Sequence, residues 1–390
     1  MLRSVNPPET PSRLRKSAYQ IAIVNVHMKR VKPDKTAQRT TVLAVPEPAP
    51  GKRKVAVMAD VAQLASVSYQ TVSRVLHDSP NVHEETRARV LAAIRQLDYR
   101  PNTMARALVT GRSKTLGVVS FDTTLYGPAS TLFGIHQAAH DAGYAVSIAS
   151  LRSLNQGTVL SAIQQLRDQG VEGVAVIAPL RAGVDALRHV RPDFAVVAVE
   201  AGPDASIPVT TVDQKAGAAA ATQHLLNLGH KTVWHLAGPT DWKEAEDRIE
   251  GWKATLKAAG ARVPALLRGD WTARSGYEAA HNLLQIDELT AVLVGNDQMA
   301  LGLLRRLHEV GRKVPGELSV VGFDDIPEAA YFTPPLTTVR QDFAELGRRC
   351  LHTLLDRIGG NTAPVRVVVA PELIVRGSTA RPRHRKSSVL

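Results

Sequence analysis

The sequence predicts a protein of two folded parts, a small all-α unit near the N-terminus and a larger α/β core made of two subdomains. Three observations lead to this prediction. The chain has 390 residues, which exceeds the usual size of one domain. From Thr115 onwards, short Val- and Ile-rich runs alternate with amphipathic helical stretches, as in parallel sheets with right-handed crossovers. Aromatic residues make up only 4% of the chain, which favours an α/β interior over an aromatic-rich β-sandwich.

The net positive charge of the chain comes entirely from its first third. The formal net charge is +12; residues 1–114 carry 20 Lys and Arg against 8 Asp and Glu, whereas residues 115–390 carry 28 of each kind. This asymmetry indicates a basic module that meets a polyanion, attached to a body that does not. From charge alone, a basic tail that only aids solubility is the alternative.

The two ends of the chain and its single cysteine set further expectations. Residues 1–54 contain seven prolines among scattered basic residues, so we expect a disordered basic extension. Residues 377–390 form a basic tail without apolar heptads, which excludes a coiled coil there. With only Cys350, no run of 18 apolar residues and no recognisable cleavage site, we expect a cytoplasmic protein without a membrane span or disulfide.

Residues 55–100 are predicted to form three short helices. Apolar residues recur at helical spacing over residues 57–65. After a break, Ser68 can cap a second helix over residues 69–76, and a third helix begins near Glu84. Two short helices joined by a tight turn and supported by a third constitute a helix-turn-helix DNA-binding domain.

The outward face of the second predicted helix carries side chains that can bind DNA bases. Tyr69, Gln70, Ser73 and Arg74 lie on this face. Arginine can bind guanine through two hydrogen bonds, glutamine can bind adenine in the same way, and tyrosine can lie against the groove wall. A merely solvated face is the alternative, but the helix lengths, the turn position and the local charge all favour DNA binding.

Three motifs in this region resemble the headpiece of the LacI/GalR family of transcriptional repressors. They are Ala-Asp-Val-Ala at 59–62, Val-Ser-Tyr-Gln-Thr-Val-Ser-Arg-Val-Leu at 67–76 and Tyr-Arg-Pro-Asn at 99–102. The resemblance implies that Ser68, Tyr99 and Asn102 join the DNA contacts. Most members have glycine where this chain has Ser66; a positive φ there would cost a non-glycine residue about 1 kcal/mol.

Residues 101–114 resemble the hinge helix and linker of the same family. Pro101 can begin a helix, but the segment has too few apolar residues to be stable alone. The resemblance implies that two copies fold together in the minor groove, where Leu108 is inserted into the central base step and Ala105 and Arg106 lie at the groove. An ordinary linker helix is the alternative.

Residues 115–376 are predicted to form two successive parallel α/β units. The expected strands lie at 116–120, 145–148, 173–177 and 195–199 in the first unit and at 233–236, 291–294 and 318–321 in the second. Ligands of such sheets bind beyond the carboxyl ends of the strands, so we expect a cleft between the units. The resemblance extends through this body and implies a periplasmic-binding-protein-like fold for ligand binding and dimerisation.

Six residues of the body match positions that contact the effector in this family. They are Arg248, Trp271, Asn296, Asp324, Gln341 and Phe343. Asp324 and Asn296 follow strands and can bind vicinal hydroxyls, and the Arg248 guanidinium can donate to two of them. Trp271 can stack on a pyranose. Asp297 and Asp325 could instead be helix caps, and Trp252 fits a packing role better.

The sequence contains no sign of an enzyme. It has no dinucleotide fingerprint, phosphate-binding loop, serine nucleophile elbow or zinc-protease motif. We therefore expect no catalytic residues, no cofactor and no metal. The family resemblance instead implies a homodimeric repressor that binds a palindromic double-stranded DNA operator and is released by a small-molecule effector, with a galactoside-like sugar favoured. A corepressor-type member that senses a purine and a freestanding sugar-binding protein remain the alternatives.

Overall fold

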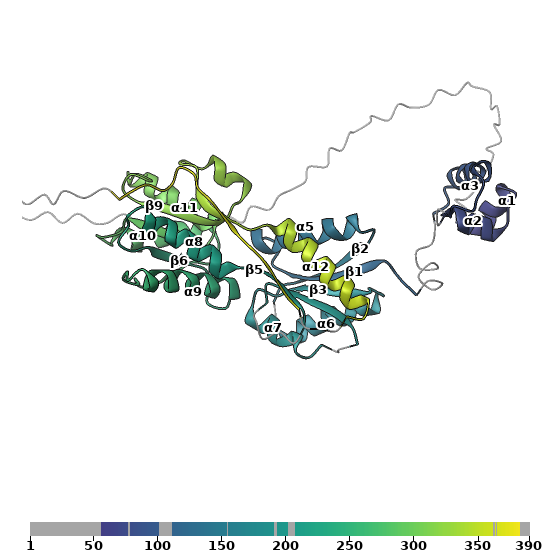
Figure 1. Ribbon diagram of the computed structural model, residues 1–390, viewed down its shortest axis with the longest axis horizontal. Coiled ribbons are helices and arrows are strands. Elements are labelled where there is room, and N and C mark those ends of the chain that lie inside the picture. Colours follow the sequence, from purple (N-terminus) through teal and green to yellow (C-terminus); the bar gives the residue numbers. More distant parts are fainter. Residues whose placement is uncertain are drawn as a thin grey trace, which may run out of the picture. The chain divides into compact units, whose positions relative to one another are not determined.

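The computed structural model describes residues 56–76, 79–100, 111–153, 155–190, 193–201, 207–361, 363 and 365–382. The chain divides into two compact units after Tyr99 (Figure 1). The expected extension over residues 1–54 lies outside the described residues. So do four of the expected DNA contacts, Asn102, Ala105, Arg106 and Leu108.

The described part of the N-terminal unit is a bundle of three helices, as the sequence predicts. They are α1 (Met58–Leu64), α2 (Tyr69–Leu76) and α3 (Glu84–Gln96). The Ser68 hydroxyl accepts a hydrogen bond from the Thr71 backbone N–H at 3.2 Å, so Ser68 caps α2 as expected. Ser66, in the turn between α1 and α2, has a φ of +52°. The turn therefore has the left-handed backbone that glycine adopts without steric cost.

The apolar faces of the three helices meet in one small core. Its buried members are Val61, Ala62, Ala65, Val72, Val75, Val90, Ala93 and Tyr99. This core leaves the polar face of α2 uncovered within the unit.

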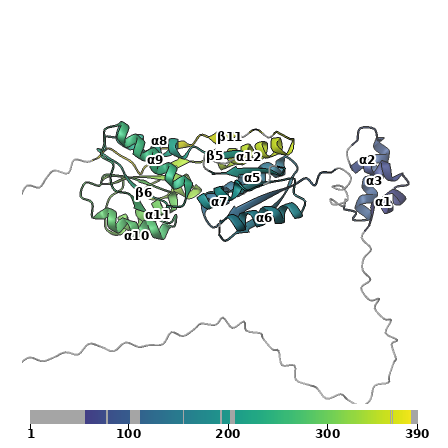
Figure 2. The same ribbon diagram turned by 90° about the horizontal axis from the view of Figure 1, so that it is seen from below.

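The first subdomain of the body contains a sheet of six parallel strands in the order β11-β5-β4-β3-β1-β2. The strands are β1 (Thr115–Phe121), β2 (Ala145–Leu151), β3 (Gly173–Ile177), β4 (Ala195–Val199), β5 (Val209–Val212) and β11 (Arg366–Val369). The accompanying helices are α5 (Tyr126–Asp141), α6 (Gln156–Asp168), α7 (Arg181–Leu187) and α12 (Phe343–Ile358). Helices α5 and α12 pack against each other beside this sheet (Figures 1 and 2).

The second subdomain repeats this architecture with strand order β12-β10-β9-β8-β6-β7. Its strands are β6 (Trp234–Ala237), β7 (Leu267–Arg268), β8 (Ala291–Val294), β9 (Ser319–Asp324), β10 (Thr337–Arg340) and β12 (Glu372–Ile374). Its helices are α8 (Gln214–Asn227), α9 (Lys243–Ala258), α10 (Ala273–Leu284), α11 (Asp297–Glu309) and the 3₁₀ helix η1 (Pro327–Tyr331). All strand pairs are parallel except β10 with β12.

The seven strands expected from the sequence are present, but the expectation of two successive units is wrong. After β10 the chain returns to the first subdomain as α12 and β11, and then re-enters the second as β12. The chain therefore passes between subdomains three times. Strands β5 and β10 were missed because Thr occupies half of their short lengths, so neither has the continuous aliphatic run of a buried strand.

Two glycines permit the close contact of α5 with α12. A Cβ on Gly134 would lie 2.2 Å from the Phe343 carbonyl oxygen, and a Cβ on Gly347 would lie 2.2 Å from the Gly134 carbonyl carbon. Neither position has room for a side chain. This contact places the first turn of α12, with Phe343, at the edge of the first subdomain that faces the second.

None of the described helices is long and apolar enough to cross a membrane.

Candidate ligand pocket and DNA-binding helix

A pocket lies between the two subdomains, at the carboxyl ends of their strands. It encloses about 410 Å³ of empty space, part of which is open to solvent. It is lined by Leu125, Tyr126, Gly127, Pro128, Thr131, Glu200, Trp242, Glu244, Arg248, Trp271, Asn296, Asp324, Gln341 and Phe343. The six residues predicted from the sequence are all in this lining. The location is the one that parallel α/β topology favours for a ligand.

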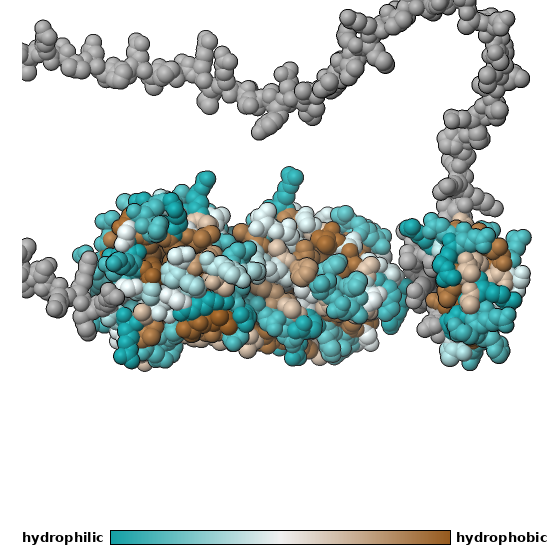
Figure 3. Space-filling view, turned by 90° about the horizontal axis from the view of Figure 1, so that it is seen from above, coloured by the Kyte–Doolittle hydropathy of each residue, from teal (hydrophilic) through white to brown (hydrophobic). Residues whose placement is uncertain are grey.

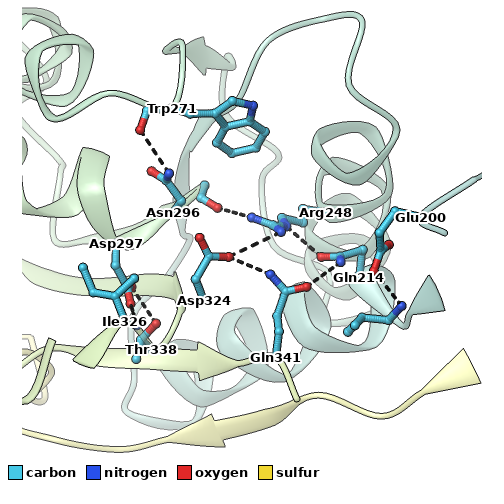
Figure 4. Close-up of polar contacts among 12 residues, drawn as sticks. Glu200, Gln214, Arg248, Trp271, Asn296, Asp297, Asp324, Ile326, Thr338 and Gln341 are labelled. Carbon is cyan, nitrogen blue, oxygen red and sulfur yellow. Dashed lines mark hydrogen bonds and ion pairs between the residues drawn. The ribbon is translucent and has the colours of Figure 1, made fainter. Parts of the chain in front are cut away.

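Arg248 is the centre of the polar network in the pocket (Figure 4). The residue lies on α9 and is only 4% exposed. Its Nε donates to the Gln214 side-chain oxygen at 2.9 Å, and its Nη1 donates to the Gly295 carbonyl oxygen. Its guanidinium also lies 3.8 Å from the centroid of the Phe323 ring. These contacts hold the guanidinium in one orientation, with Nη2 directed towards Asp324.

Asp324 and Gln341 complete a closed ring of polar contacts with Arg248 and Gln214. The Gln341 amide donates to Asp324 Oδ1 at 2.7 Å and accepts from the Gln214 amide at 2.7 Å. Arg248 Nη2 lies 3.7 Å from Asp324 Oδ1. Burial raises the pKa of Asp324 to about 6, although the Arg248 charge and the Gln341 hydrogen bond lower it. Asp324 therefore carries its charge at neutral pH only with the help of these partners.

Trp271 and Asn296 are joined by a hydrogen bond from the Asn296 side chain to the Trp271 backbone. Asn296 caps α11 by accepting from the Met299 N–H at 2.9 Å, and its amide donates to the Trp271 carbonyl oxygen at 3.0 Å. Trp271 has a φ of +75°, a conformation that bulky residues rarely adopt. Its ring packs edge-on against Trp242 at 5.6 Å between centroids. The Asn296 amide is thus already engaged within the protein, whereas the Trp271 indole nitrogen has no hydrogen-bond partner among the described residues.

Asp297 and Asp325 are not helix caps. The cap of α11 is Asn296, which accepts from the Met299 N–H. Asp297 instead accepts hydrogen bonds from the Ile326 N–H at 2.9 Å and from the Thr338 hydroxyl at 2.6 Å. Asp325 forms ion pairs with Arg340 and Arg376, both at 2.7 Å. Asp297 thus joins α11 to Ile326 and to β10, and Asp325, directly after β9, is joined to β10 and to Arg376.

Trp252 has the packing role that the sequence suggests. It is fully buried, and its indole N–H donates to the Val233 carbonyl oxygen at 2.8 Å.

Sequence reasoning missed two acidic residues of the pocket, Glu200 and Glu244. Glu200 directly follows β4, and its carboxyl accepts from the Thr211 hydroxyl at 2.8 Å and from the Val212 N–H at 3.1 Å. Glu244 lies one helical turn before Arg248 on α9. A search for polar residues directly after each expected strand would have found Glu200, and the spacing from Arg248 would have found Glu244.

In the N-terminal unit, α2 presents most of its expected DNA-binding side chains to solvent. Ser68, Tyr69, Gln70 and Arg74 are exposed, with Tyr69 at 59%, and Ser73 is half-buried. Tyr99 is only 8% exposed, because its ring packs in the three-helix core. Burial of Tyr99 also raises the pKa of its hydroxyl. The structure thus gives Tyr99 a packing role, and its DNA contact stays a prediction.

Comparisons with known proteins agree with both parts of this structure. Residues 57–102 match the family described as bacterial regulatory proteins, lacI family, and residues 222–379 match the periplasmic binding protein-like domain. The chain is 32% identical over 328 residues to the lactose operon repressor of Klebsiella pneumoniae, which covers 84% of this chain and 93% of that protein. The chain belongs to the LacI family.

Other LacI-family relatives span nearly their full lengths in the comparison. The transcriptional repressor PurR of Haemophilus influenzae is 32% identical, with 83% of this chain and 98% of PurR covered. The transcriptional regulator CelR of Thermobifida fusca is 34% identical, with 84% and 99% covered. These relatives are repressors and regulators of transcription.

Solved structures of the family have the same fold. The lac repressor dimer bound to operator and the anti-inducer ONPF has a TM-score of 0.76 at 31% identity, with 84% of this chain and 100% of that chain covered. The CelR–cellobiose complex has a TM-score of 0.61 at 31% identity, with 83% and 99% covered. This LacI-family protein is therefore a DNA-binding transcriptional regulator, and its pocket occupies the part of the fold that serves ligand binding in α/β sheets.

Proposed function

We propose that the protein is a repressor whose homodimer binds a palindromic operator and is released by a sugar that enters the pocket between the subdomains. The observation that carries this proposal is the arrangement of the pocket's side chains. Arg248, Asp324 and Gln341 present donors and acceptors beside the Trp271 ring. Such a set suits a polyol with one apolar face, because the hydroxyls pair with the polar groups while the ring stacks.

The contacts across the pocket support a mechanism in which the ligand changes the relation between the subdomains. The backbone of Trp242 forms a β-bridge with Leu180, and the Lys243 N–H donates to the Pro179 carbonyl oxygen at 2.9 Å. These contacts join the second subdomain to the first beside the pocket. A ligand that binds better to one arrangement shifts the equilibrium between arrangements, and residues 101–114 would pass that change to the DNA-binding unit.

The operator-binding role rests on α2. Its exposed Tyr69, Gln70 and Arg74 form a polar face on a helix that is otherwise held by its apolar side. An exposed arginine and glutamine on such a helix fit recognition of guanine and adenine in the major groove.

Dimerisation is supported by the surface and by the relatives. Figure 3 shows apolar patches among polar ones on one face of the molecule. Large apolar side chains exposed on the body include Phe133, which is 64% exposed, Ile148, Leu301 and Val310. The operator complex of the lac repressor is described as a dimer. Sedimentation of the full-length protein at micromolar concentration measures this directly, and a monomer would contradict it.

A purine effector is the second candidate, because PurR matches this chain at the same 32% identity as the lactose operon repressor. The two candidates differ in the sign of regulation. A sugar inducer should weaken operator binding, and a purine corepressor should strengthen it. By linkage, the operator must change affinity for the effector by the same factor.

The test begins by selecting an operator from random double-stranded DNA with the full-length protein. Its affinity is then measured by fluorescence anisotropy with neutral monosaccharides and disaccharides and with purines. Loss of operator affinity with a sugar, and no such response in an Arg248→Lys variant that still binds the operator, supports the proposal. Strengthened binding with a purine overturns the sugar assignment. Failure to select any DNA sequence overturns the operator-binding role.

A further inference from the structure

The charges that line the pocket do not balance. Its lining holds three carboxyl groups, from Glu200, Glu244 and Asp324, and one cation, Arg248. The Arg248 guanidinium already pairs with Asp324 and donates hydrogen bonds to Gln214 and to the Gly295 carbonyl oxygen. Among the described residues, neither glutamate forms an ion pair.

Two lysines on the packed helices α8 and α9 are directed to other carboxylates. Lys243 pairs with Asp247, and Lys215 pairs with Asp247 at 3.7 Å and with Glu250. These lysines therefore do not neutralise the two glutamates of the pocket.

The two glutamates differ in how firmly they are held. Glu200 has a φ of +59°, and the Thr211 hydroxyl and the Val212 N–H each bind one of its carboxyl oxygens. Glu244 has no hydrogen-bond or ion-pair partner among the described residues of the protein. Glu200 is thus a fixed acceptor, whereas Glu244 is a carboxyl group whose bonding capacity is unused until a ligand enters.

Proton binding compensates for the missing cation. Burial raises the pKa of Glu200 to about 7 and that of Glu244 to about 8. Repulsion from Glu200, Asp324 and Asp247 contributes to this raised pKa of Glu244, whereas Arg248 opposes the rise in the pKa of both glutamates. Near pH 7 the pair therefore holds protons that a bound cation would displace.

We propose that Glu200 and Glu244 make this pocket selective for a polyhydroxylated ligand that carries a protonated amine, such as an amino sugar, over its neutral counterpart and over anionic sugars. This inference rests on the proposed function, since it concerns the effector of the same pocket. The amine would donate to both glutamates while Arg248, Asp324 and Gln341 bind hydroxyls. A sugar phosphate would face two unpaired carboxyl groups and is rejected by repulsion.

A metal ion is a poorer occupant for these carboxyl groups. Within the part of the chain that the structure describes, no group of three or more His, Cys, Asp and Glu side chains is placed to hold one. An ammonium group needs only hydrogen-bond acceptors around it, and two carboxyl groups provide several.

The test compares matched sugars that differ in a single substituent. Isothermal titration calorimetry of the full-length protein at pH 7, where the free amine is mostly protonated, uses glucosamine with glucose, galactosamine with galactose, and the β-1,4-linked glucosamine dimer with cellobiose. Glucose 6-phosphate is the anionic probe. We expect at least one amino member to bind about tenfold more tightly than its neutral partner, as for a charge pair in a partly desolvated site. Repeating the titration in buffers of different ionisation enthalpy should reveal release of about one proton, and the preference should shrink at pH 6.

Two variants connect the preference to the glutamates. Glu244→Gln keeps the size of the side chain and removes its charge, so the amino and neutral members should bind within about twofold of each other. Glu200→Gln is the second variant, in case the first does not fold. Glu250→Gln is the control on the same helix, because Glu250 is exposed and pairs with Lys215 outside the pocket; it should keep the full preference.

Each outcome decides the inference. Tighter binding of the amino member that is lost in Glu244→Gln or Glu200→Gln supports it. Equal or tighter binding of the neutral member, or a preference that survives both variants, overturns it and leaves the sugar-responsive function standing. Binding of none of these sugars overturns the inference together with the proposed sugar effector.

Discussion

Replacing Arg248 by alanine should destabilise the body of this LacI-family protein in a pH-dependent manner. The substitution removes the hydrogen bonds to Gln214 and to the Gly295 carbonyl oxygen, and it removes the cation beside Asp324. Because Arg248 is only 4% exposed, water cannot readily replace what is lost. A buried carboxylate is left without a counter-charge.

The size of the effect follows from this arrangement. Removing one partner of a buried ion pair costs about 3–5 kcal/mol of unfolding free energy, and we expect this loss at pH 8. The pKa of Asp324 is about 6 in the folded protein, above its ordinary value. At pH 5 this carboxyl is largely protonated, so Arg248 has less charge to stabilise. The loss at pH 5 should therefore fall to about 2 kcal/mol, the contribution of hydrogen bonds from a charged donor.

Urea denaturation followed by tryptophan fluorescence measures these losses. All four tryptophans lie between residues 234 and 271, so the signal reports on the second subdomain. Arg305→Ala is the matched control, since Arg305 is exposed and pairs with Glu309 at 2.9 Å; water screens an exposed pair, so its loss should change the unfolding free energy little at either pH. An equal loss at pH 5 and pH 8, or a loss no larger than that of the control, would refute the reasoning.

Four further outcomes follow from individual contacts. Ser66→Gly should stabilise the N-terminal unit by about 1 kcal/mol, because the φ of Ser66 is +52°; an unchanged calorimetric transition of that unit would contradict this. Gly251→Ala should cost about 1–3 kcal/mol of unfolding free energy, since its Cβ would lie 2.2 Å from the Lys215 carbonyl oxygen and separate α8 from α9; a wild-type urea midpoint would show that the helices can adjust. Arg74→Ala should weaken operator binding by about 1–3 kcal/mol and relax base preference in a binding selection, and an unaltered preference would remove Arg74 from base recognition. Between pH 5 and pH 8, the melting temperature of Glu244→Gln should rise relative to that of the wild type. The reason is that the wild-type folded state binds the Glu244 proton more tightly than the unfolded state, so the wild type loses stability as pH rises and the variant does not. A constant difference across this range would count against the raised pKa.

Much of the pocket could be predicted from single positions along the chain. Asp324 ends β9 and Asn296 closely follows β8, and polar residues at such positions lie at the ligand-binding edge of a parallel sheet. Arg248, Trp271, Gln341 and Phe343 came from resemblance to the family. Pattern alone does not show that the Asn296 amide is occupied by α11 and by the Trp271 backbone, because these bonds depend on how separate segments pack.

Local sequence determined the elements with a strong periodic signal. In the N-terminal unit, helical spacing of apolar residues, the Ser68 cap and the turn at Ser66 specify three helices within a short stretch of chain. In the body, continuous aliphatic runs specify the central strands, which are buried on both faces. These signals are readable because each depends only on neighbouring residues.

Only the tertiary structure decided which segments meet. In the tertiary structure, α12 and β11 join the first subdomain although they follow most of the second in sequence, and this places Phe343 in the pocket. The tertiary structure also brought Glu200, at the end of a strand in one subdomain, near Glu244 on a helix of the other, and so created the acidic pair. Periodicity tells which face of an element is buried, but the partner of that face is selected by packing across the whole chain, where apolar surfaces from distant segments exclude water together.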